Sequence, residues 1–227
     1  MSLVLSLETS TSICSVALHK EHELIACYEL FLEKSHAENS TQLIDHILYT
    51  TGFDKKQLDA IAISKGPGSY TGLRIGTATA KGLCLALNIP LIAVPTLTAM
   101  AHQVNLFNTE HYLLCPMIDA RRMEVYCAIY DHSLNSIRET AAEILDEKSF
   151  HEILEKHTVL FFGNGAEKFN SFSTYPSTKI IVNGIHPSAK NIGALAFPKF
   201  QQKQFEDLAY FEPFYLKEFI GKKSFSS

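Results

Sequence analysis

A glycine-rich turn that runs directly into a helical segment constrains the fold of this chain more than any other feature. Residues 64–82 read SKGPGSYTGLRIGTATAKG and follow the apolar stretch AIAIS at 60–64. A short, continuously apolar stretch is typical of a strand that is buried on both faces. Glycines after such a strand let the backbone turn sharply into a helix. The pattern predicts a strand–turn–helix unit, which is the building block of an α/β fold.

The same stretch raises the question of phosphate binding. A P-loop needs lysine and a hydroxyl residue directly after its last glycine, and a dinucleotide fingerprint needs G-x-G-x-x-G; neither pattern occurs here. The segment instead carries a stripe of small residues with a spacing of four: Gly72, Gly76, Ala80 and Cys84. Such a stripe lets another element approach the helix closely. Three interpretations stay open: close packing within the chain, a helix interface with a partner, or a phosphate cradle.

Hydrophobic patterning divides the chain into two halves that share one order of elements. Three strands open residues 1–105, and three strands open residues 106–227; in each half, helices and strands then alternate. We therefore predict a structural duplication with two α/β subdomains that contain mixed sheets. The C-terminal helices of the second half are candidates to return to the first subdomain.

Composition limits the classes of function. The net charge of -4 argues against a large basic surface, so any contact with nucleic acid is expected to be local or supplied by a partner. The five cysteines form no C-x-x-C pair, which favours buried, reduced thiols in a reducing cytoplasm. The N-terminus lacks a basic region, and no apolar run approaches the length of a membrane span. We expect a soluble, cytoplasmic protein that does not enter the membrane.

Four stretches resemble the TsaB family, the dimerisation subunits of the bacterial machinery for tRNA threonylcarbamoyladenosine (t6A). The most specific is SKGPGSYTGLRIG, and the other three are LVLSLETSTSICSVAL, IDARRMEVYCAIY and HPSAKNIGALA. The resemblance implies the actin-like and Hsp70-like ATPase (ASKHA) fold with a degenerate nucleotide site. It also implies a non-catalytic scaffold that binds the catalytic subunit TsaD and helps recruit the ATPase TsaE. The complex modifies the adenosine adjacent to the anticodon, and the scaffold contacts tRNA indirectly.

The resemblance further implies docking through helices of the first subdomain, with a homodimer when the chain is alone. A helix is predicted to follow SHAE at 35–38, which fits a capping box, and a second helix is predicted from about residue 71 to 87. Gly76→Leu is expected to block docking because it would fill a groove between helices. We expect the partner interface to comprise Leu43, Ile47, Tyr70, Leu73, Arg74, Gly76, Thr77 and Lys81.

An ATPase of this fold needs a metal-binding carboxylate and two loops that grip phosphates. The first loop is partly present as Glu8, Thr9 and Ser10, but the second reads DARRME without glycine. Asp119 could still bind a metal and the following arginines a phosphate or an acidic partner, or salt bridges could close this loop. The histidines show no metal-binding spacing. We expect a vestigial site with no cofactor and no metal, at most weakly binding ATP or ADP. The alternative is an independent ATP-dependent kinase or transferase of the same fold.

Overall fold

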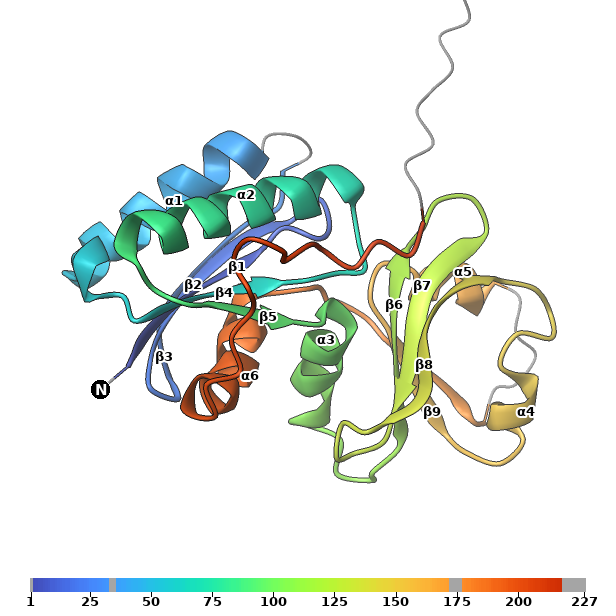
Figure 1. Ribbon diagram of the computed structural model, residues 1–227. Helices are drawn as coiled ribbons and strands as arrows, with labels where there is room; N and C mark the ends of the chain where they lie inside the picture. Colours follow the sequence, from blue (N-terminus) through green and yellow to red (C-terminus); the bar gives the residue numbers. More distant parts are fainter. Residues whose placement is uncertain (1, 33–35, 172–176, 218–227) are drawn as a thin grey trace, which may run out of the picture.

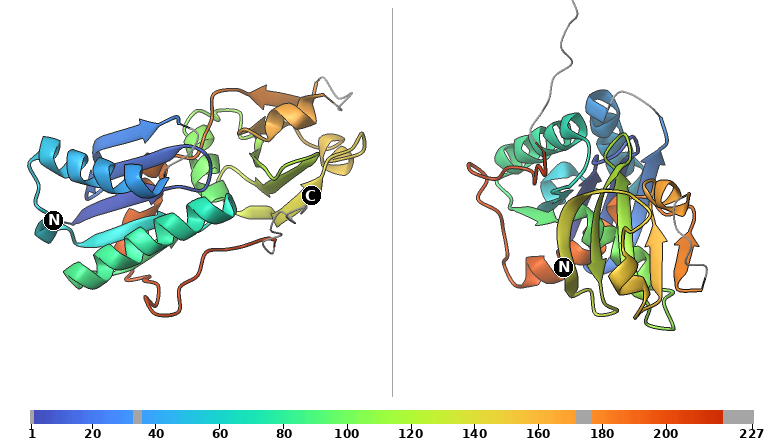
Figure 2. Two further views of the ribbon diagram at one scale, coloured as in Figure 1. Left: turned by 90° about the horizontal axis from the view of Figure 1, so that it is seen from above. Right: turned by 90° about the vertical axis from the view of Figure 1, so that its right-hand side faces the viewer.

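The computed structural model describes residues 2–32, 36–171 and 177–217 of the 227-residue chain. It shows two five-stranded mixed sheets, each with helices on its faces (Figures 1 and 2). This arrangement confirms the predicted α/β class. Within the described part of the chain, every helix is too short or too polar to span a membrane.

The first sheet combines a parallel half with an antiparallel half. Its strand order is β3-β2-β1-β4-β5. The central strand β1 pairs in parallel with β4 and antiparallel with β2, so the hairpin between β1 and β2 lies beside the turn that follows β4. The strands are β1 (Leu3–Glu8), β2 (Cys14–Lys20), β3 (Glu23–Leu30), β4 (Ala60–Ser64) and β5 (Leu91–Val94).

The second sheet repeats this topology. Its strand order is β10-β9-β6-β7-β8, which corresponds strand for strand to the first sheet read from the opposite end. Strand β6 therefore occupies the place of β1, and the β6–β7 hairpin that of the β1–β2 hairpin. The strands are β6 (Leu113–Asp119), β7 (Glu124–Tyr130), β8 (Ser136–Ile144), β9 (Val159–Phe162) and β10 (Lys179–Val182).

The last helix of each half crosses to the other sheet. Helices α1 (His36–Thr51) and α2 (Tyr70–Leu87) cover one face of the first sheet, and α6 (Ala189–Gln201) covers the other (Figure 1). Helix α3 (Thr96–Asn105) packs on β6 and β7 of the second sheet and against α6. Thus α6, which comes from the second half of the sequence, lies with the first sheet.

The remaining helical segments are short. A 3-10 turn (Lys55–Gln57) precedes β4, and α4 (His151–Leu154) and α5 (Ala166–Asn170) cover the second sheet. Helix α4 is a single helical turn, with non-helical turns on either side. Ser35, the first residue of the expected capping box before α1, lies outside the described residues.

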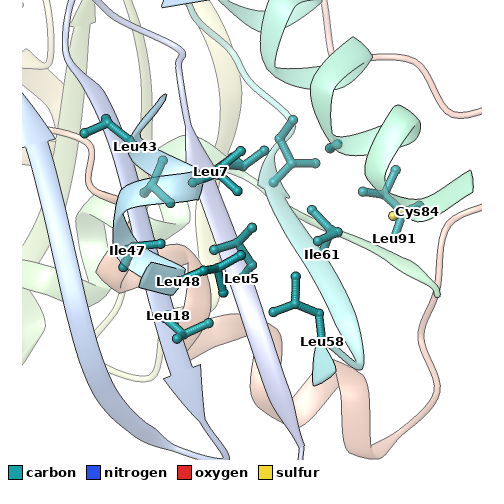
Figure 3. Packing of buried hydrophobic residues seen from close by; sticks show 14 of the residues in the cluster. Leu5, Leu7, Leu18, Leu43, Ile47, Leu48, Leu58, Ile61, Cys84 and Leu91 are labelled. Atoms are coloured by element: carbon teal, nitrogen blue, oxygen red, sulfur yellow. The ribbon is translucent and has the colours of Figure 1, made fainter. Parts of the chain in front are cut away.

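Apolar side chains of α1 fill the space above the first sheet. Leu43, Ile47 and Leu48 point toward β1 and β2, where they contact Leu5 and Leu18 among others (Figure 3). The side chain of Ile47 is fully buried. Burying a leucine or isoleucine of this kind contributes roughly 1.5–3 kcal/mol to stability.

A segment without regular structure, residues 206–217, runs from β5 across α2 to the β6–β7 hairpin (Figures 1 and 2). We call it the C-terminal strap. Backbone hydrogen bonds fasten it to the first sheet: the Glu206 N–H donates to the Leu91 carbonyl, and the Phe214 N–H donates to the Lys65 carbonyl. Beyond these bonds, an ion pair between Lys217 and Glu124 ties the strap to the second sheet.

Candidate docking face and nucleotide loops

The first hairpin loop, residues 9–13, holds a buried carboxyl group at its start. Glu8 ends β1 and is completely buried. Its Oε1 accepts hydrogen bonds from the Ser10 N–H at 2.6 Å and the Ser64 hydroxyl at 2.9 Å. Burial raises the pKa of Glu8 above its ordinary value, and these hydrogen bonds oppose that shift only in part. Among the described residues, Oε2 has no hydrogen-bond partner.

Helix α2 presses directly on this first loop. The Thr9 hydroxyl donates to the Gly72 carbonyl at 2.8 Å. A Cβ atom at Gly72 would collide with the Thr9 carbonyl oxygen, and a Cβ atom at Gly76 would collide with the Thr9 hydroxyl. Glycine is needed at both positions because no other residue lets the backbones approach this closely. The small-residue stripe therefore packs within the chain, and the close packing answers the question that the glycine pattern raised.

The first loop does not fit a phosphate group. The Ser10 N–H, which a phosphate loop would offer to its ligand, already donates to Glu8. The Ser10 carbonyl accepts from the Ser69 N–H at 2.6 Å, so α2 begins against the loop rather than against an open space. A buried carboxyl at Glu8 without a cation would also repel a phosphate whenever it ionises. The residues that are present thus disfavour the nucleotide group that this fold carries in ATPases.

The second hairpin loop, residues 120–123, is exposed and held by an ion pair. Lys168 of α5 lies 2.6 Å from Asp119 Oδ1, the same oxygen that accepts from the Arg121 N–H at 2.6 Å. The Asp119 N–H donates to the Asn164 side chain at 2.9 Å. Asp119 is thus neutralised by a lysine at the place where a metal would need it. Within the described residues, no group of three or more His, Cys, Asp or Glu side chains could hold a metal ion.

Five of the eight expected interface residues lie inside the chain's own core, which corrects the expectation that they contact a partner. The side chains of Leu43 and Leu73 are 9% and 1% exposed, and Ile47 is fully buried (Figure 3). Thr77 and Gly76 are buried as well. The resemblance implied docking through these helices, but these five residues lie on the faces of α1 and α2 that cover the sheet. Gly76→Leu would therefore damage the fold and cannot test docking.

Two of the three other expected interface residues, Tyr70 and Lys81, contact the C-terminal strap. The ring of Tyr70 lies 4.8 Å from that of Tyr215, and the Arg74 guanidinium lies 5.5 Å from the Tyr70 ring. Lys81 Nζ donates to the carbonyl oxygens of Ala209 and Phe211 at 3.4 and 3.2 Å. Tyr70 and Lys81 thus fasten the strap to α2, whereas Arg74 contacts Tyr70 on its own helix and is exposed to solvent.

A second row of small residues lies on the opposite, exposed side of α2. Ala78, Gly82 and Ala86 follow the same spacing of four, and a Cβ atom at Gly82 would meet nothing within 4 Å. Leu85 beside this row is 77% exposed, and Tyr49 of α1 is 85% exposed. We call these five residues the outer α1–α2 face. The spacing was visible in the sequence, but only the fold shows which of the two rows faces outward.

Solved structures share this architecture. YeaZ from Pseudomonas aeruginosa superposes with a TM-score of 0.80 and 26% identity, covering 95% of this chain and 100% of that one. The activator of the 2-hydroxyisocaproyl-CoA dehydratase from Clostridium difficile, solved with bound ADPNP, aligns with a TM-score of 0.53 at 9% identity over 90% of this chain and 98% of its own. The second likeness concerns the fold alone.

Proteins with similar sequences show to which family the chain belongs. The Escherichia coli tRNA threonylcarbamoyladenosine biosynthesis protein TsaB is 30% identical over 97% of this chain and 96% of its own length. The chain belongs to the TsaB family. The same-named protein of Buchnera aphidicola subsp. Baizongia pistaciae is 31% identical over 96% of this chain and 99% of its own. The family model of TsaD, described as tRNA N6-adenosine threonylcarbamoyltransferase, matches residues 31–223, so TsaB-family chains and TsaD share one fold.

Proposed function

We propose that this TsaB-family chain is a docking subunit, without a reaction of its own, in the formation of threonylcarbamoyladenosine in tRNA. It binds TsaD, helps recruit the ATPase TsaE, and pairs with a second copy of itself when alone. The observation that carries the proposal is the engaged first loop: α2 packs on Thr9 through Gly72 and Gly76, and the N–H and carbonyl of Ser10 are already bonded within the chain.

The same observation disfavours an independent kinase or transferase. Such an enzyme would need both hairpin loops open toward a nucleotide, whereas Ser10 is engaged by Glu8 and Ser69, and Asp119 is paired with Lys168. We therefore assign no nucleotide or metal cofactor to the chain and expect at most weak binding of ATP or ADP.

Docking is proposed to use the outer α1–α2 face. Rows of small residues let a partner helix approach closely, and exposed Tyr49 and Leu85 supply an aromatic and an aliphatic anchor. Because the TsaD family model matches this chain, TsaD has equivalent helices that could pack against this face. A second copy of the chain presents the same helices, so the homodimer would compete with TsaD.

The decisive variant is Gly82→Trp, which fills the outer row without an internal clash. We expect calorimetric titration with purified TsaD to show binding weakened by about tenfold or more, because a bulky ring separates the two helices. The melting temperature should change little, since Gly82 is exposed and a Cβ atom there meets nothing within 4 Å among the described residues.

Glu167→Trp on the exposed side of α5 is the matched control, because it adds the same ring far from α1 and α2. It should leave TsaD binding unchanged. A folded Gly82→Trp chain with the affinity of the wild type would refute the proposed face. Tight, stoichiometric binding of ATP and Mg²⁺ in the same calorimeter would refute the assignment of a docking subunit without its own reaction.

A further inference from the structure

The backbone of the second hairpin loop adopts conformations that are unfavourable for the residues it contains. Arg121 and Arg122 adopt left-handed conformations, with φ of 70° and 47°. The turn is tight: the Ala120 N–H donates to the Glu124 carbonyl, and the Glu124 N–H donates to the Arg121 carbonyl. Glycine and asparagine adopt such conformations at least cost, while arginine is strained in them. Two adjacent arginines there cost stability, which points to a function for their side chains.

The side chains around this turn carry more positive than negative charge. No carboxylate of the described residues forms an ion pair with Arg121 or Arg122, and both are exposed. The two nearest acidic groups, Asp119 and Glu124, are already paired with Lys168 and Lys217. The local balance is thus cationic, although the chain as a whole has a net charge of -4.

Aromatic rings flank the same charges. Tyr126 of β7 lies within electrostatic reach of Arg121 and Lys217. On the side of the first sheet, Tyr215 of the strap stacks against Tyr70, and both rings are partly exposed. The strap runs toward the β6–β7 hairpin (Figures 1 and 2), and the ion pair of Lys217 with Glu124 joins it to the first residue of β7. We call the combined surface of Tyr70, Arg74, Arg121, Arg122, Tyr126 and Tyr215 the arginine–tyrosine patch.

We infer that the arginine–tyrosine patch binds a single-stranded segment of RNA directly. Exposed guanidinium groups match phosphates, and tyrosine rings stack with unpaired bases. The arginines without ion pairs lie beside aromatic rings, and this combination favours RNA over an acidic protein segment. An acidic segment would offer negative charge but few rings that could stack on the tyrosines. The inference rests on the proposed function, because a subunit of the tRNA-modifying machinery meets an RNA loop. It goes beyond that function, which needs no direct contact between this chain and tRNA.

The test uses the full-length chain and a fluorescent RNA hairpin with an unpaired, adenosine-containing loop, followed by fluorescence anisotropy at several salt concentrations. The variant Arg121→Asn/Arg122→Gly should bind about tenfold more weakly, and the slope of log affinity against log salt should fall by about 1.4, for two lost phosphate contacts on a single strand. Because it relieves two strained positions, its Tm should rise by about 2–4 °C. Weaker binding by a more stable protein excludes unfolding as the cause.

The matched control removes two positive charges at the far edge of the first sheet, Lys56→Asn with Lys203→Gly, where Lys203 is also left-handed. It should keep the RNA affinity of the wild type. The inference is overturned if the wild-type chain shows no binding up to roughly 100 μM, the weak end of non-specific affinity. It is also overturned if duplex RNA binds equally well, or if the arginine variant keeps its RNA affinity and loses TsaD instead. Intact TsaD docking without RNA binding would refute this inference alone and leave the proposed function in place.

Discussion

The β1–β2 and β6–β7 hairpin loops hold equivalent positions in two sheets of the same topology, yet they differ in nearly every physical property. Residues 9–11 of the first loop are buried, and the acidic residue before them, Glu8, has hydrogen bonds but no ion pair among the described residues. The second loop is exposed, and its acidic residue, Asp119, is paired with Lys168. The comparison shows that topology fixes where a loop lies, while the covering helix decides what the loop can bind.

The covering helices account for the difference. Helix α2 has 18 residues and lies on the first loop through Gly72 and Gly76. Its counterpart α5 has 5 residues and reaches the second loop through one long side chain, that of Lys168. The first loop is therefore part of the core, while the second is free to carry side chains such as Arg121 that serve recognition.

The largest loss of stability is expected from Gly76→Leu, which tests whether the close packing of α2 on the first loop stabilises the fold. The new side chain would collide with Thr9 and with Ile63 of β4. Overpacking of this kind costs about 3 kcal/mol, and the hydrogen bond from Thr9 to Gly72 would be strained as well. Urea denaturation followed by circular dichroism should show this loss of unfolding free energy.

The control is the same change on the other side of the helix, Gly82→Leu. Among the described residues, a Cβ atom at this position would meet no side chain and no backbone of another element within 4 Å. Removing a glycine from a helix interior stabilises by about 0.5–1 kcal/mol. If both variants were equally stable, the two faces of α2 would not differ and the account of the first loop would be wrong.

Much of the fold could be predicted from the sequence because periodicity and turn residues determine it locally. The three opening strands, the strand before Gly66 and the helix after Tyr70 lie where the pattern placed them. The repeat of element order likewise predicted two sheets of one topology. The sequence allowed the last helix, α6, to return to the first sheet but did not require it. The apolar pattern of a helix does not specify which of two sheets the helix covers.

The candidate site was harder to predict, and α2 shows why. Two rows of small residues with the same spacing run along it, through Gly76 and through Gly82, and sequence alone cannot tell which row faces the sheet. The strap was missed as well, because the contacts of Tyr70 with Tyr215 and of Lys81 with Phe211 join residues far apart in the chain. Long-range contacts of this kind leave no local pattern.

A smaller effect, of opposite sign, is expected from Glu8→Gln. Folding raises the pKa of Glu8 above 4.5 through burial. As the pH rises through 4.5, the unfolded chain loses this proton first, so the free energy of unfolding falls with rising pH. Glutamine cannot ionise, yet its oxygen can still accept from Ser10 and Ser64. The variant should melt a few degrees higher at neutral pH, and the gain should vanish below pH 4.5.

Thermal unfolding over a series of pH values measures this difference, and Asp119→Asn supplies the comparison. That variant weakens an ion pair with Lys168 and should lower stability at neutral pH. A loss of stability in Glu8→Gln at neutral pH would mean that the ionised carboxylate stabilises the first loop, and the contrast between the two acidic residues would disappear.

The smallest effect is expected from Lys168→Ala, which removes the cation from the second loop. The Lys168 and Asp119 side chains are 19% and 39% exposed, so solvent and salt screen their attraction. Partly exposed ion pairs contribute about 1 kcal/mol or less, and Lys168 Nζ also donates a hydrogen bond to the Glu124 carbonyl at 3.2 Å. Urea denaturation should therefore show a small loss that shrinks further at high salt. A loss of unfolding free energy as large as that of Gly76→Leu would mean that α5 holds the second loop as firmly as α2 holds the first. The exposure of the second loop would then no longer explain why it can carry two strained arginines.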